Sequence, residues 1–192
     1  MRDNFVSSLN FVLAHECVYA PGHYNDLNFV VCEDVPGDAG GCTKFGIDAA
    51  SHPGVNIPDL TLARATSLYH DGEWTQCSGD SLPAGIDTAV FDCAVNNGVR
   101  TSIILLQRSI LACGAYKLEV DGLLGPATLE AVETVCATAK WGLIEHLLEL
   151  RRDHYANIVS QHPGDAKFIP GWTANVCGDL PAWARAAGRS FS

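Results

Sequence analysis

Apolar residues recur at helical spacing through most of the chain. The first such stretch runs from about residue 4 to 18, with Phe5, Leu9 and Leu13 on one stripe. Further helices are predicted over residues 61–74, 84–96, 102–113, 126–138 and 140–161, several of them bounded by Pro, Gly or Asn. The pattern predicts a mainly α protein.

The exception is the stretch from residue 20 to 51, which is rich in Gly, Pro, Asn and Asp. Short β-prone runs occur there at residues 29–31 and 43–47. They predict a long loop that leads into a small β-hairpin element. The chain contains no internal repeat and no linker long enough to divide it.

The charge balance excludes one class of partner. With 12 basic and 22 acidic residues the formal net charge is −10, and Lys and Arg form no run. Binding of nucleic acid through phosphate neutralisation is therefore not expected. No apolar stretch is long enough for a membrane anchor, and the N-terminal residues alternate at helical spacing instead of forming the apolar core of a signal peptide.

The eight cysteines leave two alternatives open. They are either buried free thiols, or they include one to three disulfides formed after release into an oxidising compartment. The sequence has no C-x-x-C pair and no clustered Cys/His spacing, so no structural metal is expected. It also lacks a P-loop and a dinucleotide fingerprint, and no cofactor is expected.

Glu16 is the first candidate for chemistry. It lies on the apolar stripe at the end of the first predicted helix, directly before the Gly/Asp-rich loop. A carboxylate there is expected to be partly desolvated, and desolvation favours its protonated form. Such a group can donate a proton to a glycosidic oxygen. A glutamate turned out to solvent is the alternative that periodicity alone favours.

A second candidate lies in the segment DAGGCTKFGI, residues 38–47. Its adjacent glycines permit a tight turn that places Asp38 and Thr43 at the two ends of a hairpin. An Asp close to a Glu can hold a water or stabilise positive charge on a sugar, and a Thr hydroxyl can orient that water. An ordinary Asp-capped turn is the alternative.

Seven pieces of the sequence together resemble glycoside hydrolase family 108. They are AHECVYA, DAGGCTKFGI, SLYHDGEW, LPAGIDTAVFDCAVNNG, LLQRSI, VDGLLGPATLEAV, and RRDHY with FIPGW, and they occur in the family's order. The family comprises phage and bacterial peptidoglycan muramidases with an N-terminal catalytic part and a peptidoglycan-binding-like C-terminal part. The resemblance covers roughly residues 5–177. It implies a lysozyme-like helical fold.

The resemblance also implies roles for single residues. The family's catalytic glutamate heads a Glu-Gly-Gly-Tyr motif, which here reads Glu16-Cys17-Val18-Tyr19. Glu16 is thereby assigned as the general acid, and Tyr19 as a substrate-binding residue. The Asp-x-Gly-Gly-x-Thr pattern makes Asp38 the candidate second carboxylate and Thr43 its helper.

The loop between the two motifs departs from the family. Asp38 follows Glu16 by 22 residues, more than the family's pattern predicts. The extra loop, residues 20–32, carries Asp26, which competes with Asp38 for the second role or contacts substrate. The separation of the carboxylates is not readable from sequence, so inverting and retaining chemistry both remain open.

Three further residues match family positions. Trp74 is a candidate to stack on a sugar, with burial in the core as its alternative. Asp92 and Asn96 are four apart on one helical face, and are candidates to hydrogen-bond substrate groups. A buried polar network that braces the first helix is the alternative for this pair.

The expected protein is a muramidase that hydrolyses the β-1,4 bond between N-acetylmuramic acid and N-acetylglucosamine. Residues 1–98 would form the catalytic part and residues 99–192 the peptidoglycan-binding-like part of one monomeric globular unit. Its expected partner is the glycan strand of peptidoglycan, reached from the bacterial cytoplasm after release. A lytic transglycosylase and a non-catalytic peptidoglycan-binding or secretion-accessory protein remain as alternatives.

Overall fold

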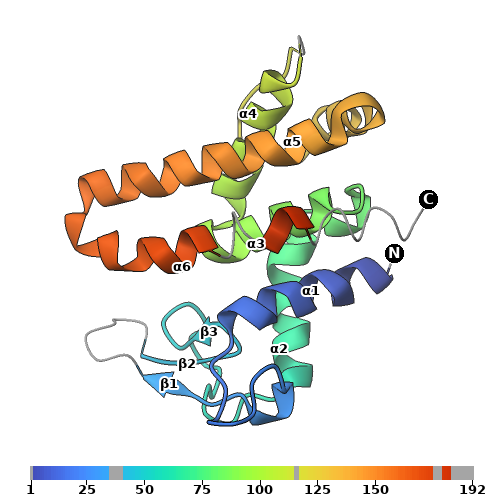
Figure 1. The fold of residues 1–192 in the computed structure, drawn as a ribbon. Coiled ribbons are helices and arrows are strands. Elements are labelled where there is room, and N and C mark those ends of the chain that lie inside the picture. The colour runs from blue at the N-terminus through green and yellow to red at the C-terminus, as the bar shows by residue number, and fades with distance from the viewer. Residues whose placement is uncertain (1, 35–40, 115–116, 175–178, 183–192) are drawn as a thin grey trace. The chain divides into compact units, whose positions relative to one another are not determined.

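The computed structural model describes residues 2–34, 41–114, 117–174 and 179–182 (Figure 1). The chain divides into two compact units. One comprises residues 6–72, and the other comprises residues 1–5 with residues 73–192. The first helix, α1 (Arg2–Glu16), therefore contributes its first turn to one unit and the rest to the other.

The unit of residues 6–72 combines helix with a small sheet. Besides α1 it contains the helix α2 (Leu62–Tyr69) and a single turn η1 (Leu27–Phe29). Three short antiparallel strands, β1 (Glu33–Asp34), β2 (Cys42–Lys44) and β3 (Ile47–Asp48), pair in the order β1-β2-β3. A small β element is thus present, but the position of the predicted hairpin is corrected: the two-residue turn lies at residues 45–46, inside the run expected as a strand, and Thr43 pairs with Glu33 and Asp48.

The turn between β2 and β3 has only two residues. Lys44 pairs with Ile47, and between them Phe45 and Gly46 both have positive φ, 56° and 76°. Two central residues with positive φ are typical of the type I′ turn that suits a two-residue hairpin. A positive φ is unfavourable for a bulky residue such as Phe45. Burial of its ring, and a 2.8 Å hydrogen bond from the Tyr69 hydroxyl to its carbonyl oxygen, hold it there.

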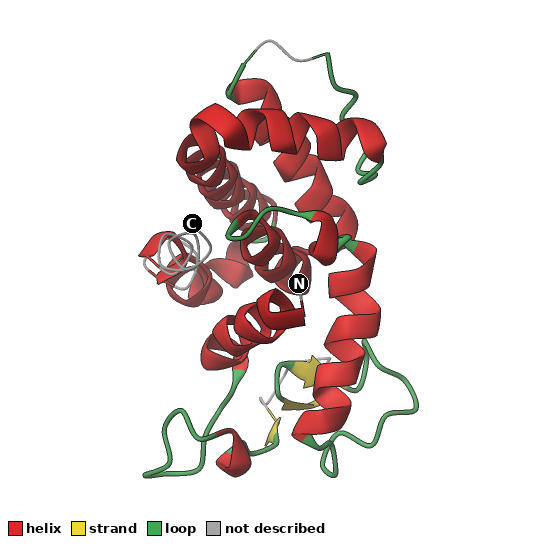
Figure 2. Ribbon diagram, turned by 90° about the vertical axis from the view of Figure 1, so that its right-hand side faces the viewer, coloured by secondary structure: helices red, strands yellow, loops and turns green. Residues whose placement is uncertain are grey.

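The segment from Cys17 to Cys32 folds back on itself (Figure 2). Tyr19 pairs with Val30, and flanking backbone hydrogen bonds join residues 18 to 31 and 20 to 29. A disulfide between Cys32 and Cys42 then ties the end of the segment to the start of β2. The long loop of the sequence prediction is therefore a paired segment that is covalently attached to the sheet.

The second unit is built from helices α3 (Ile86–Asn97), α4 (Val99–Ala112), α5 (Pro126–Gln161) and α6 (Ile169–Ala174). Shorter turns η2 (His70–Trp74), η3 (Gly79–Ser81) and η4 (Pro163–Phe168) join or flank them. Helix α3 packs against both α4 and α5, and α5 crosses α4 (Figure 1). All nine residues from Ile86 to Ala94 are buried, as expected of a helix surrounded by others.

Helix α5 is long but not uniform. Ala139 has non-helical angles, φ −138° and ψ 34°, which divide the helix into two parts. This break lies between the two helices that the sequence predicts, 126–138 and 140–161. The mainly α class is confirmed, and helix boundaries differ from the predicted ones by a few residues. No helix among the described residues combines the length and apolar character needed to cross a bilayer.

Candidate functional site

Glu16 is the last residue of α1 and is half-buried. Its side chain lies against the β2–β3 turn. A Cβ atom placed on Gly46 would lie 2.9 Å from Glu16 Cβ and 2.7 Å from the Tyr69 hydroxyl oxygen. Any larger residue at position 46 would force Glu16 or Tyr69 to shift, and the positive φ of Gly46 favours glycine as well. The turn thereby fixes the direction in which Glu16 leaves the helix.

Gly46 and Tyr69 are the residues that sequence reasoning missed at this site. Both lie within the family-like pieces, yet neither was singled out as supporting the acid. A signal was present for one of them, since glycine suits the second position of a two-residue turn, although Phe45 is not typical of the first position. Nothing in the sequence linked Tyr69 to the hairpin, because the contact joins positions 24 residues apart.

Cys17 and Tyr19 continue the chain directly beyond Glu16. Burial, with the neighbouring Glu16 carboxylate as a second cause, raises the pKa of the Cys17 thiol to about 12. A thiol with such a pKa is protonated at neutral pH and is not a nucleophile. Burial also raises the pKa of the Tyr19 hydroxyl, which hydrogen-bonds with Cys17. Both groups are therefore neutral neighbours of the candidate acid.

Thr43 lies in β2, half-buried, and pairs with Glu33 on one side and Asp48 on the other. It precedes Gly46 by three residues. Thr43 and Gly46, which contacts Glu16, therefore belong to the same short hairpin. Asp38 lies outside the described residues. Its assignment as the second carboxylate remains an expectation from the family's pattern.

Asp26, the alternative to Asp38 as the second carboxylate, caps the turn η1. Its carboxylate accepts hydrogen bonds from the backbone N–H and the side-chain amide of Asn28, at 3.0 and 2.8 Å. The backbone hydrogen bond from Asn28 is the main cause that lowers the pKa of Asp26. The group is therefore ionised and already engaged in a local cap.

Trp74 does not present a face to a sugar. Its side chain is only 1% exposed, and its ring packs on Phe5 and Phe91 with centroids 5.3 and 5.4 Å apart. Gly79 approaches the ring so closely that any Cβ there would collide with it. The prediction of a stacking role is corrected in favour of its alternative, a tryptophan of the core.

Asp92 is also buried, at 1% exposure, and forms a salt bridge with the equally buried Arg151 of α5. Tyr155 accepts a 2.9 Å hydrogen bond from Arg151 Nε and a 3.1 Å bond from Asn97. This network braces α3 against α5 and not against the first helix, and it leaves Asp92 unavailable to substrate. Asn96 is exposed and donates to the Asp92 backbone carbonyl at 3.0 Å, so the two side chains do not form one site.

The turn before α5 is organised by a buried glutamine. Gln107 donates to the Asp121 carboxylate at 2.8 Å and accepts from the Gly122 N–H at 2.9 Å. Its amide also donates to Leu123 O and to the Thr128 hydroxyl. These hydrogen bonds of Gln107 explain the VDGLLGP motif as a structural turn.

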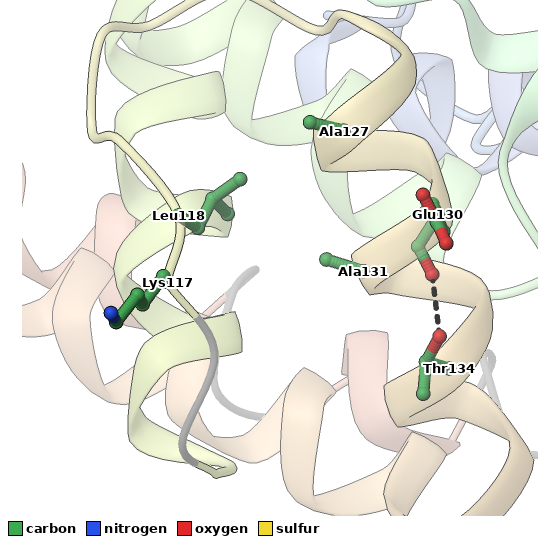
Figure 3. Close-up of a pocket in the computed structure, with 6 residues that line it drawn as sticks. All are labelled: Lys117, Leu118, Ala127, Glu130, Ala131 and Thr134. Atoms are coloured by element: carbon green, nitrogen blue, oxygen red, sulfur yellow. Dashed lines mark hydrogen bonds between the residues drawn. The ribbon is translucent and has the colours of Figure 1, made fainter.

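A hollow of about 210 Å³ lies beside this turn, at the start of α5. Figure 3 shows Leu118 facing Ala127 and Ala131 across it, and its remaining lining residues are Lys117, Glu130 and Thr134. None of the sequence-predicted site residues lines this hollow.

The cysteines are of two kinds. Cys32 and Cys42 form a disulfide, whereas the remaining cysteines of the described part are free: Cys17, Cys77, Cys93, Cys113 and Cys136. Within the same part of the chain, no group of three His, Cys, Asp or Glu side chains is placed to hold a metal ion.

Two stretches of the chain match known protein families. Residues 9–98 match the family described as Glycosyl hydrolase 108, and residues 101–177 match one described as a Predicted Peptidoglycan domain. The solved structure of SagA from Brucella abortus is similar over 98% of both chains, with 25% sequence identity and a TM-score of 0.77. Curated proteins gave no match.

Residues 9–98 therefore resemble the glycosyl hydrolase 108 family, and residues 101–177 resemble a peptidoglycan domain. These matches support a glycoside hydrolase that acts on peptidoglycan. The Glu16 site lies wholly within the first match. The division of the chain into a catalytic and a peptidoglycan-binding-like part at residue 98 remains a prediction. The two compact units have a different boundary, since α3 belongs to the same unit as α4 and α5.

Proposed function

We propose that this chain is a muramidase that cleaves the β-1,4 bond between N-acetylmuramic acid and N-acetylglucosamine, with Glu16 as its general acid. The observation that carries the proposal is the packing of Glu16 against Gly46 in the hairpin that also bears Thr43. Glu16 and Thr43, one residue from each of the two family-like motifs, belong to the same compact unit, which supports the proposal.

In the proposed reaction the protonated Glu16 carboxyl donates its proton to the oxygen of the scissile bond. The leaving sugar departs with that oxygen as a hydroxyl, and positive charge develops on the remaining ring. Asp38 stabilises this charge or activates water, and Thr43 orients the water. The half-buried position of Glu16 supports its role, because contact with the hairpin restricts the side chain.

The products of digestion test this proposal. Purified sacculi treated with the protein are analysed by mass spectrometry, and soluble fragments ending in reducing N-acetylmuramic acid are expected. Fragments with 1,6-anhydro ends would instead identify a lytic transglycosylase, in which the muramyl 6-hydroxyl replaces water. Binding to sacculi without release of any fragment would identify a non-catalytic wall-binding protein.

A further inference from the structure

Exposed apolar side chains are concentrated on one short segment. Of the eight large hydrophobic residues that are exposed in the described chain, four lie between residues 18 and 31: Val18, Tyr24, Phe29 and Val31. Single exposed apolar residues are ordinary, but a cluster of them is typical of an interaction surface. This cluster begins two residues after Glu16.

The bridge between Tyr19 and Val30 joins the two ends of the segment. Val30 is buried, at 8% exposure, whereas its neighbours Phe29 and Val31 are 41% and 38% exposed. Val18 is joined to Val31 by a backbone hydrogen bond and is also exposed, at 41%. The side chains of Val18, Phe29 and Val31 are therefore open to solvent, with Phe29 at the end of the turn η1.

Two rings at the tip of the segment, those of His23 and Phe29, are held against each other before any ligand arrives. The rings of His23 and Phe29 are stacked, with centroids 3.6 Å apart and planes inclined by 15°. Tyr24, beside this pair in sequence, is 79% exposed. Turns with backbone hydrogen bonds from His23 N to Ala20 O and from Phe29 N to Asp26 O fix the tip. An ordered aromatic surface loses little conformational entropy when it binds.

Both ends of the segment are attached to elements of the candidate site. It starts at Cys17, directly after Glu16, and it ends at Cys32, whose disulfide partner Cys42 precedes Thr43. A pyranose ring presents C–H groups on its faces, and these pack favourably on aromatic rings. A glycan strand that passes Glu16 and continues along this segment would find such rings.

From these observations we infer that Tyr24 and the stacked pair His23–Phe29 form a glycan subsite, which holds sugars of the strand beyond those at Glu16. The inference rests on the proposed function, because the occupant is the same peptidoglycan glycan strand that Glu16 cleaves. Its contribution is to affinity for long strands and not to the chemical step.

Tyr24→Ala tests the subsite through kinetics. With long soluble glycan strands the KM is expected to rise about fivefold, the loss of one aromatic contact, while kcat stays within twofold. With a substrate too short to reach the segment, neither constant changes. Tyr24→Phe keeps the ring and restores the KM. Val6→Ala is the control for an exposed apolar residue, since Val6 on α1 is 54% exposed and lies outside both matched stretches.

A binding measurement separates failure of the subsite from failure of the proposed function. In a Glu16→Gln background, Tyr24→Ala is expected to weaken binding of purified glycan strands about fivefold, whether or not the parent protein cleaves them. Binding within twofold of the parent would overturn the subsite, as would an equal loss with Val6→Ala. Weakened binding to whole sacculi but not to peptide-free strands would assign the surface to another wall component and would also overturn it.

Discussion

At the scale of single residues, the account depends on how Glu16 is held. The side chain leaves the end of α1 and meets Gly46, whose lack of a Cβ makes the contact possible. Tyr69 closes the arrangement by donating to the carbonyl of the strained Phe45. The acid is thus positioned by a hairpin turn that follows it by 30 residues.

Gly46→Ala tests this positioning. The methyl group would overlap Glu16 and Tyr69, and overpacking of this kind costs about 1–3 kcal/mol of unfolding free energy. We expect at least a tenfold loss of activity on sacculi, measured by turbidity. Gly54→Ala is the matched control, because Gly54 also has positive φ (91°) but no atom within 4 Å of an added Cβ. Equal losses in both variants would show that backbone strain alone is responsible.

The two candidate second carboxylates can be ranked by replacing each with Asn. Asp26 is engaged by Asn28 as the cap of η1, so Asp26→Asn is expected to retain at least a third of the wild-type activity. Asp38→Asn is expected to lower activity about 100-fold, as loss of a catalytic carboxylate does. A severe loss of activity in Asp26→Asn, with near-normal activity in Asp38→Asn, would show that Asp26 supplies the second carboxylate.

At the scale of elements, periodicity predicted the helices well and the small sheet only in outline. Helix faces repeat over many residues, so the predicted 126–138 and 140–161 even located the break at Ala139. Strands of two or three residues leave too little pattern, and pairing such as Tyr19 with Val30 depends on contacts distant in sequence. Trp74 shows a further limit of sequence-based prediction. The spacing of apolar residues along a helix does not show whether an aromatic ring is buried or open to a ligand.

The disulfide between Cys32 and Cys42 links two of these elements and encloses Asp38 in sequence. Closing a loop of this length stabilises a protein by about 3 kcal/mol, mainly by restricting the unfolded chain. The double variant Cys32→Ser, Cys42→Ser is expected to lose about this much in urea unfolding followed by circular dichroism.

The same bond should control activity. Reduction with dithiothreitol is expected to lower the activity of the wild type but not that of the double variant, which serves as the control for effects on other thiols. A variant as stable and active as the wild type would show that the bond neither stabilises the sheet nor supports the site.

At the scale of the whole molecule, the net charge of −10 opposes approach to an anionic cell wall. The Debye length falls from about 30 Å at 0.01 M salt to about 10 Å at 0.1 M. Activity on sacculi is therefore expected to rise over this range, whereas activity on a neutral soluble oligosaccharide should stay constant. A steady fall with salt on sacculi would indicate that local basic residues, such as Lys44 and Arg64, guide the strand.

The most direct test of the central claim is the activity of Glu16→Gln on purified sacculi. Glutamine keeps the size of the side chain but cannot donate the proton, and such a donation is typically worth about 100-fold or more in rate. We expect that loss, with thermal stability and glycan binding unchanged, and no loss for Glu133→Gln on the exposed surface of α5. Retention of more than about a tenth of wild-type activity by Glu16→Gln would contradict its role as the general acid.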